Sequence, residues 1–141
     1  MSKELLSTSI FKLFDAYRHN MRKAMKANEL GICSMHVQCI LYIKQHQACT
    51  ANDIVKHLAR DKAQIARLIK EMIEKTWLVK QINPNDKRSQ QLLLTEKGHA
   101  LADSIQQTQH QVHQQMQNQL NTEDLIEFQR IANLLTKNLQ P

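Results

Sequence analysis

Glycine and proline are scarce in this chain, with two residues of each among 141. All-β sandwiches and barrels need many turn residues, and each chain reversal favours glycine, proline or asparagine. Dinucleotide-binding and P-loop folds need glycines where the backbone approaches a phosphate. The sequence is poorly suited to these classes and favours a mostly helical fold. At this length we expect one domain with its own hydrophobic core.

Long apolar runs and paired cysteines are missing as well. No apolar segment approaches the roughly 20 residues that a membrane span requires, and the N-terminus does not resemble a signal peptide. We therefore expect a cytoplasmic protein with no membrane partner. Cys33, Cys39 and Cys49 are an odd number without C-x-x-C spacing, which excludes a disulfide framework and a zinc ribbon. No nucleophile–base grouping is recognisable, so we do not expect an enzyme.

Positive charge is in excess. The 19 Lys and Arg residues against 13 Asp and Glu give a formal net charge of +6, with a pI of about 9.4. A basic excess favours partners that carry negative charge, either nucleic acid or an anionic membrane surface.

Apolar residues recur at steps of three and four along residues 4–27. The spacing predicts a long amphipathic helix, and Gly31 interrupts the pattern. Ser34 is expected to cap a second helix that runs to about residue 47. The apolar stripe of the first helix consists of Leu6, Ile10, Leu13, Phe14, Tyr17 and Met21.

Two shorter helices are expected next. Thr50 starts one of them, and Asp53 three residues later completes a capping arrangement. Asp61 is the expected N-cap of the other, over residues 61–75. Because the two helices meet at residues 60–61, they have the dimensions of a helix-turn-helix.

The hydrophobic period then changes from helical to alternating. Residues 78–82 and 90–95 predict two strands, and residues 83–86 predict the turn between them. A helix-turn-helix followed at once by a hairpin with a charged tip is a winged helix. The predicted fold class is therefore mostly α with a small β-hairpin wing.

Amphipathic helices at the two ends of the chain have no obvious partner inside so small a module. Thr95 is expected to start a long helix, and Asn121 or Thr122 to cap the last one. Packing against the same helices of a second subunit is the economical way to bury their apolar faces. We therefore expect a homodimer with N- and C-terminal dimerisation helices. The predicted stripes are Leu101, Ile105, Val112, Met116 and Leu120, then Leu125, Phe128, Ala132, Leu135 and Leu139.

The hairpin and the helix start after it carry a specific pattern, D-x-R at Asp86 and Arg88 and L-T-x-x-G at Leu94, Thr95 and Gly98. This pattern resembles the wing and following helix of the MarR family, the multiple-antibiotic-resistance-type regulators. The order of elements extends the resemblance over nearly the whole chain. It implies a single MarR-type domain over residues 1–141, with a winged-helix DNA-binding lobe at 34–98 and a helical dimerisation region at 1–30 and 99–141.

The resemblance also implies a function. Such proteins are transcriptional regulators, most of them repressors, that bind double-stranded DNA as homodimers. A pseudo-palindromic operator would match the two-fold symmetry. Release from DNA would follow binding of a small molecule, often aromatic or phenolic, between the dimer helices and the DNA-binding lobe.

Helix 61–75 is the expected recognition helix. Gln64 suits bidentate bonds to adenine and Arg67 suits guanine, whereas Lys62 and Lys70 suit phosphates. An ordinary solvated helix face is the alternative for this set.

The wing tip supplies the other predicted DNA contact. Arg88 is expected to enter the minor groove, where narrow A·T-rich segments attract arginine. The resemblance gives Asp86 the role of holding the Arg88 guanidinium. Lys87 is expected to support the Arg88 contact by binding phosphates. The alternative is a surface ion pair in a β-turn. Ser34 and Thr50, each at a predicted helix start, are either phosphate contacts or simple caps.

One position departs from the family pattern. Many members have glycine at the end of the recognition helix, where this chain has Thr76. Because a β-branched residue resists the left-handed conformation, we expect this helix to end by another route.

Regulation leaves several alternatives open. Leu13, Tyr17, Met21, His36 and Cys39 line an effector pocket or simply pack together. Cys33 and Cys49 lie near helix starts, where a lowered thiol pKa would suit redox sensing, whereas Cys39 fits a core position. His110 and His113 share a helix face, but no carboxylate or thiolate lies near them in sequence, so no metal or other cofactor is expected. The alternatives to a ligand-responsive repressor are therefore a redox- or metal-responsive regulator, and a winged-helix protein-interaction module that does not bind DNA.

Overall fold

The computed structural model describes residues 3–141, and the side chains of all of these except residues 3, 4, 28 and 87. It is mostly helical, with a single described hairpin in which β1 and β2 pair antiparallel. The predicted fold class, a winged helix-turn-helix, is confirmed. In chain order the elements are α1 (Lys3–Ala24), α2 (Ala27–Leu30), α3 (Ser34–Gln45), α4 (Ala51–Leu58), α5 (Lys62–Glu74), β1 (Leu78–Asn83), β2 (Asp86–Leu94), α6 (Glu96–Met116) and α7 (Thr122–Leu139).

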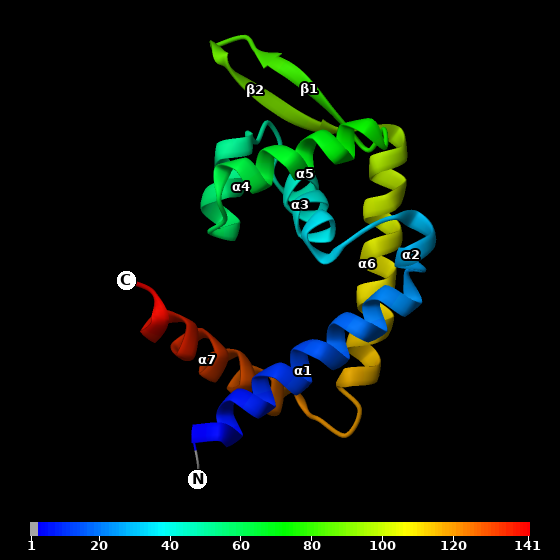
Figure 1. Ribbon diagram of the computed structural model, residues 1–141. Coiled ribbons are helices and arrows are strands. Elements are labelled where there is room, and N and C mark those ends of the chain that lie inside the picture. Colours follow the sequence, from blue (N-terminus) through cyan, green and yellow to red (C-terminus); the bar gives the residue numbers. More distant parts are fainter. Residues whose placement is uncertain (1–2) are drawn as a thin grey trace.

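Helices α3, α4 and α5 and the hairpin gather in one lobe, as Figure 1 shows. Helix α6 leads away from the base of the hairpin to α1, and α7 turns back toward the lobe. The core lies where α3, α5 and α6 meet the hairpin. Its completely or nearly completely buried side chains are Cys39, Ile40, Ile54, Ile65, Ile69, Met72, Leu78, Leu92 and Ile105.

Three of the predicted helix caps are confirmed. Thr50 and Asp53 exchange hydrogen bonds, because each backbone N–H donates to the other side chain. Asp61 accepts from the backbone N–H of Ala63 at 2.9 Å, and Asn121 is the cap of α7. These caps satisfy N–H groups that would otherwise have no partner at a helix start.

The prediction that Ser34 caps α3 is wrong. Cys33 occupies the N-cap position with an extended backbone, and Ser34 is the first residue of the helix. The backbone N–H of Cys33 donates to Nδ1 of His36 at 3.1 Å. A histidine three residues into the helix therefore does what Glu or Gln does in a standard capping box.

The wing is longer than its hydrophobic pattern indicated. The register runs from Leu78 opposite Leu94 to Ile82 opposite Gln90, and shifts at Asn83, which pairs with Asp86. Strand β2 begins at Asp86 instead of residue 90. Alternation reveals a strand only where one face is buried, and the described side chains at the hairpin tip are mostly exposed.

The predicted avoidance of a left-handed residue at Thr76 was wrong. Thr76 has φ 65°, and α5 ends as a Schellman motif. The N–H of Trp77 donates to the carbonyl of Met72 and the N–H of Thr76 to that of Ile73, both at 2.9 Å. The hydroxyl of Thr95 donates to the Thr76 carbonyl at 2.5 Å, and Trp77 is buried. These contacts offset the backbone strain.

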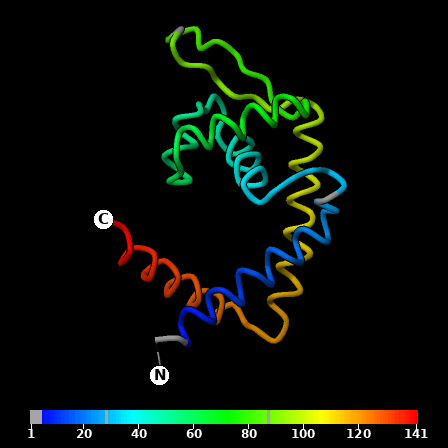
Figure 2. Tube along the Cα trace, viewed as in Figure 1, coloured from blue at the N-terminus to red at the C-terminus, as the bar shows by residue number. Residues whose placement is uncertain are grey.

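The apolar faces near the two ends of the chain are open to solvent. Among its described side chains α7 has none that is buried, and Figure 2 shows it standing apart from the lobe. Helix α6 ends before Leu120, and Met116 is exposed. The large exposed apolar side chains of α1 and α7 are Leu5, Leu6, Ile10, Phe11, Leu13, Phe14, Ile126, Phe128, Ile131, Leu134, Leu135 and Leu139. Over the described residues, no helix is both long and apolar enough to cross a bilayer.

Candidate nucleic-acid interface

Helix α5 presents an open, basic face. Burial of Ile65, Leu68, Ile69 and Met72 fixes which side of the helix faces the core. Arg67 and Lys70 are exposed on the other side, Lys62 is exposed at the N-terminal end of the helix, and Gln64 is half-buried. The three predicted basic residues therefore all face solvent on one helix, and Gln64 is turned partly inward.

Two small residues on the same face were not predicted. Ala63 and Ala66 are exposed between the basic side chains. Small side chains let a helix approach base edges closely, and alanine can contact the methyl group of thymine. Periodicity missed them because alanine is compatible with either face of a helix.

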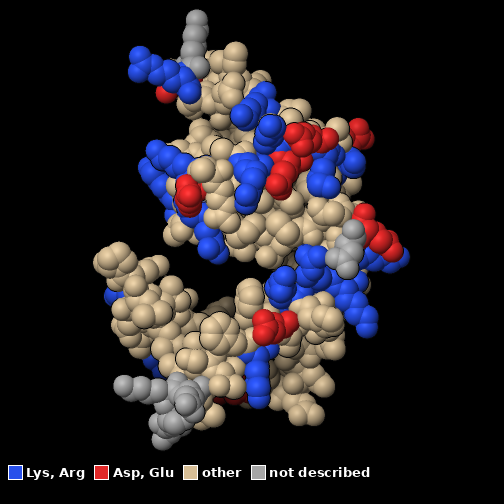
Figure 3. Space-filling model, viewed as in Figure 1, with Lys and Arg blue, Asp and Glu red and all other residues tan. Residues whose placement is uncertain are grey.

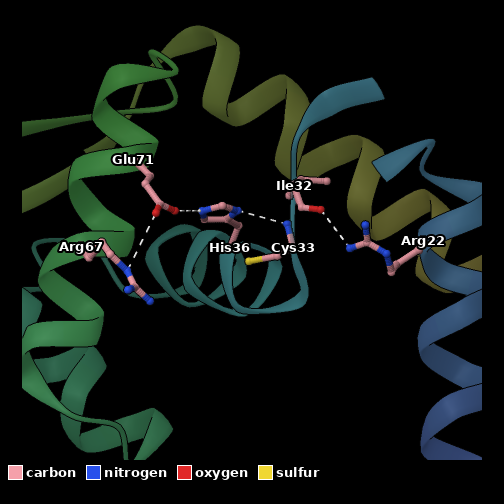
Figure 4. A network of polar contacts seen from close by, with 6 residues as sticks. All are labelled: Arg22, Ile32, Cys33, His36, Arg67 and Glu71. Atoms are coloured by element: carbon pink, nitrogen blue, oxygen red, sulfur yellow. Dashed lines mark hydrogen bonds and ion pairs between the residues drawn. The ribbon is translucent and has the colours of Figure 1, made fainter. Parts of the chain in front are cut away.

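A chain of polar contacts leads from Arg67 into the lobe. Nε of Arg67 lies 4.0 Å from Oε1 of Glu71, and Oε2 of the same carboxylate lies 2.9 Å from Nε2 of His36. Figure 4 shows the sequence of contacts from α5 through α3 to the backbone at Cys33. His36 is buried, whereas the Arg67 side chain is 71% exposed.

The wing tip is ordered by carboxylate and amide side chains. Oδ1 of Asp86 accepts from the backbone N–H of Arg88 at 3.0 Å, and Oδ1 of Asn83 accepts from the backbone N–H of Asn85 at 3.0 Å. Asp86 thus holds the backbone at Arg88, which corrects the expectation that it holds the guanidinium. The Arg88 side chain is exposed at the tip. The side chain of Lys87, predicted to support it, lies outside the described residues.

A groove of about 540 Å³ lies between the start of α4 and the wing. Thr50 and Arg88 both line it, so the structure brings these two predicted residues together. Lys80 on β1 also lines the groove and was missed by the sequence analysis, since a single exposed lysine in a strand carries no pattern. Cys49 ties the two walls together, because its carbonyl accepts from the N–H of Leu92 at 2.8 Å.

Ser34 lies elsewhere. It is exposed at the start of α3 and lines a cavity with residues of α1, not the groove beside the wing. Among the predicted DNA contacts whose side chains are described, it is the one that the structure sets apart from the others.

Charge is distributed unevenly over the molecule. In the view of Figure 3, Lys and Arg side chains gather on the lobe and near the α1–α2 junction, whereas the region of α7 is largely uncharged. A positive lobe carrying an exposed helix suits a polyanion.

The cavity beside Ser34 has a volume of about 220 Å³ and a mostly apolar lining. Of the five predicted pocket residues, Tyr17 and Met21 line it. Leu13, His36 and Cys39 do not, since Leu13 lines a neighbouring cleft with Met116, and His36 and Cys39 are buried behind the wall. The lining consists of Phe14, Tyr17, Arg18, Met21, Arg22, Met25, Ala27, Ile32, Cys33, Ser34, Val37, Gln38, Leu41 and Gln109.

Side chains that sequence reasoning missed supply the polar part of this wall. Arg18 and Arg22 come from α1, and Nη1 of Arg22 donates to the carbonyl of Ile32 at 3.1 Å. The hydroxyl of Tyr17 lies 3.1 Å from Nε2 of His113, and burial raises the pKa of Tyr17 against a smaller opposing effect of its hydrogen bond to Gln109.

The thiols differ in their surroundings. Burial raises the pKa of Cys49 to about 11, with a further contribution from the nearby Asp53 carboxylate. Of the two alternatives left open for this thiol, its surroundings therefore disfavour a lowered pKa. Cys39 is fully buried, which confirms its place in the core, and burial raises the pKa of its thiol to about 12. Cys33 is half-buried and lines the cavity.

The histidine pair on α6 is split between two environments. His113 stacks on Tyr17 with ring centroids 5.7 Å apart, whereas His110 is exposed. In the part of the chain that the structure describes, His, Cys, Asp and Glu side chains form no group of three or more that would suit a metal ion.

Comparisons with known proteins place this geometry in a family context. A model of the MarR family matches residues 35–90, which include α4, α5 and most of the wing. The HTH-type transcriptional regulator BilQ of Clostridioides difficile is 33% identical over 66 residues, 47% of this chain and 45% of that protein. The match therefore spans less than half the length of that relative.

Solved structures of similar fold cover nearly the whole chain. A MarR transcriptional regulator of Methanosarcina mazei superposes with a TM-score of 0.79 and 20% identity, covering 96% of each chain. The S. aureus MepR–DNA complex gives 0.82 and 19%, covering 99% of this chain and 100% of the other. An E. coli MarR variant in complex with operator DNA gives 0.78 and 22%, covering 96% and 94%. At such identities the likeness concerns the fold.

Proposed function

We propose that the chain is a sequence-specific transcriptional regulator of the MarR family, and that it binds double-stranded DNA as a homodimer. The observation that carries this proposal is the exposed face of α5, which presents Lys62, Arg67 and Lys70 on the same lobe as a wing bearing Arg88. Such a helix fits the major groove, and an arginine on a hairpin tip fits the adjacent minor groove. A cytoplasmic location is part of this proposal.

The residues divide between base reading and positioning on the backbone. Arg67 is the strongest candidate for a base contact, because it is the exposed arginine of the helix. Lys62 and Lys70 suit phosphates, and the half-buried Gln64 can reach adenine only at close approach. At the wing, Thr50 and Lys80 share a groove with Arg88. Ser34 and Lys87 stay in the proposed set of phosphate contacts on sequence grounds alone.

A homodimer accounts for the apolar surface at both ends of the chain. Exposed contiguous apolar faces of this size are unusual on a monomer, and α7 has no buried side chain of its own among those described. In a two-fold dimer the same faces of α1 and α7 cover each other. The two copies of α5 would then meet half-sites with centres about one helical turn apart.

Fluorescence anisotropy with two duplexes tests DNA binding directly. The probes are the DNA upstream of the protein's own gene and a scrambled duplex, each at two salt concentrations. A specific regulator prefers its own region by about a thousandfold or more, and its affinity falls steeply with salt as counterions are released. Arg88→Ala should bind clearly worse.

Equal weak binding to both duplexes, unchanged in Arg67→Ala and Arg88→Ala, would favour the alternative of a protein-interaction module. A ligand retained from expression can mimic that result, so native mass spectrometry of the purified protein is the accompanying control.

Ligand responsiveness is a second part of the proposal, and the cavity between α1 and α3 supports it. Its apolar lining suits an aromatic molecule, and Arg18 and Arg22 at its wall suit a phenolate or carboxylate. A ligand that favours a dimer with misplaced recognition helices weakens DNA binding by linkage. Benzoate and phenol are suitable first probes, read as a shift in thermal unfolding. Val37→Phe, which fills the cavity, should abolish that shift.

A further inference from the structure

We propose that His36 and Glu71 are positioning residues for Arg67, and that they set how strongly the chain discriminates bases. This inference rests on the proposed function, since it concerns the same recognition helix. Three side chains from two helices form it, in the order His36, Glu71 and Arg67 from the core outward (Figure 4).

The orientation of the His36 ring is fixed from three sides. Its Nδ1 accepts from the backbone N–H of Cys33 at 3.1 Å. The ring also packs edge-on against Trp77, with centroids 5.7 Å apart and planes at 77°. Because Nδ1 is an acceptor, the ring N–H is at Nε2, which lies 2.9 Å from Oε2 of Glu71. The imidazole therefore donates a hydrogen bond from a rigid, buried site.

Glu71 connects the rigid His36 ring to Arg67. Its Oε2 accepts from His36, and its Oε1 faces Nε of Arg67 at 4.0 Å. A carboxylate held at one oxygen presents the other at a defined place. An isolated Glu–Arg pair one turn apart on an exposed helix face is flexible and weak, whereas here the carboxylate of the pair is anchored to the core by a buried ring.

The contact with Glu71 leaves the outer nitrogens of the Arg67 guanidinium open. Glu71 approaches Nε, on the inner edge of the guanidinium, so Nη1 and Nη2 stay available for a bidentate contact with guanine. A long side chain loses rotamer freedom when it binds, and fixing it beforehand reduces that cost. A carboxylate on a recognition helix also repels phosphates, and in this proposal the positioning of Arg67 offsets that cost.

The test measures base preference instead of affinity alone. Wild-type protein, as the full chain, first selects its site from a library of random duplexes. Dissociation constants are then measured for the selected site and for each single base-pair change. The affinity of the wild type should fall about tenfold or more when the guanine that Arg67 contacts is replaced. In Arg67→Ala most of this preference for guanine should be lost.

Glu71→Gln should also lose part of the preference at that base pair, by about two- to fivefold, while its non-specific binding stays equal or becomes tighter. Glu74→Gln is the matched control, because it removes the same charge one turn further along the same helix, from an exposed side chain. It should keep the wild-type preference.

Two His36 variants separate the positioning role from the cap. His36→Gln keeps a donor that can reach Glu71, and His36→Asn keeps an acceptor near Cys33 but cannot reach Glu71. We expect His36→Asn to lose preference at the Arg67 base pair and His36→Gln to retain more of it. If His36 had only a structural role, its variants would lose base preference at all positions of the site, in proportion to their loss of stability. Urea unfolding of each variant measures that stability.

The outcomes distinguish the two proposals. If selection enriches no site, or Arg67→Ala discriminates as the wild type does, the proposed DNA-reading function of this helix fails. If Arg67→Ala loses preference and Glu71→Gln does not, the positioning role is overturned. Sharper discrimination in Glu71→Gln would also overturn it, since Glu71 would then be masking Arg67.

Discussion

The carbonyl oxygen of Trp77 lies against Gly98, so close that a β-carbon on Gly98 would be 2.1 Å from it. That oxygen cannot move aside easily, because it accepts from the backbone N–H of Thr95 at 3.0 Å. Thr95 in turn caps α6, where its hydroxyl oxygen accepts from the N–H of Gly98. The glycine of the L-T-x-x-G pattern thus allows the backbone at the base of the wing to pack directly against the first turn of α6.

Gly98→Ala should therefore destabilise the fold by about 3 kcal/mol, the upper part of the usual cost of overpacking. Urea unfolding followed by circular dichroism measures this change. Gly31→Ala is the comparison, since Gly31 has φ 66° but its new β-carbon would meet only the mobile end of Lys75. It should cost about 1 kcal/mol, the strain of a left-handed alanine. Equal costs for the two variants would contradict the steric argument.

Thr76→Gly should stabilise the protein by about 0.5 to 1 kcal/mol. Glycine relieves the strain of a β-branched residue at φ 65°, and its greater freedom in the unfolded chain offsets part of that gain. The measurement is again the free energy of unfolding in urea. Ala100→Gly, at an exposed position inside α6, is the control and should lose about 1 kcal/mol. A loss in both variants would mean that Thr76 is not strained.

Several features of the structure were predictable because they depend on neighbours in the sequence. The caps at Thr50 and Asp61 involve groups two or three residues apart, and the D-x-R motif closes a turn of the same size. The fold class followed from periods of 3.6 and 2, which report which faces are buried.

Other features depend on contacts between distant residues. Glu71 is four positions from Arg67 but 35 from His36, and the sequence does not indicate that a buried ring holds it. The cavity between α1 and α3 also depends on residues that are distant in the sequence. The apolar stripe through Tyr17 and Met21 shows which side of α1 faces inward, but it does not show whether side chains of other helices fill the space beside it. Thr76 adopts a conformation that its own preference opposes, because tertiary contacts of Trp77 and Thr95 favour it.

The three cysteines should react with iodoacetamide in a fixed order in the native protein. At pH 8 a thiol with a pKa of about 11, as for Cys49, is ionised in roughly one molecule in a thousand. Cys49 and Cys39 are also buried, whereas Cys33 lines the cavity. Peptide mass spectrometry should therefore find Cys33 alkylated first, and the other two only after unfolding in urea.

The same experiment bears on redox sensing. Cys33→Ser should leave the native protein essentially unlabelled. If peroxide abolishes DNA binding in the wild type and in Cys33→Ser but not in Cys49→Ser, the buried Cys49 thiol is reactive after all. That result would contradict the environment described for it.

Acidic substitutions at the two ends of the chain should dissociate the proposed dimer. Phe11 on α1 is 65% exposed in the single subunit and Phe128 on α7 is 55% exposed. In a two-fold interface each substitution occurs twice, and burying an unpaired carboxylate costs at least about 2 kcal/mol. The wild type should sediment at twice the chain mass of 16.4 kDa. Phe11→Asp and Phe128→Asp should shift toward the monomer.

DNA binding should weaken in step with dissociation, because one subunit alone contacts only one half-site. Ile82→Asp is the matched control, since Ile82 is 62% exposed but lies on the wing. It adds the same charge and should leave the dimer intact, while a carboxylate near phosphates weakens binding to any duplex. A wild type that sediments as a monomer would overturn the proposed dimer. A Phe128→Asp variant that remains fully dimeric would place the subunit interface elsewhere and leave the exposed face of α7 unexplained.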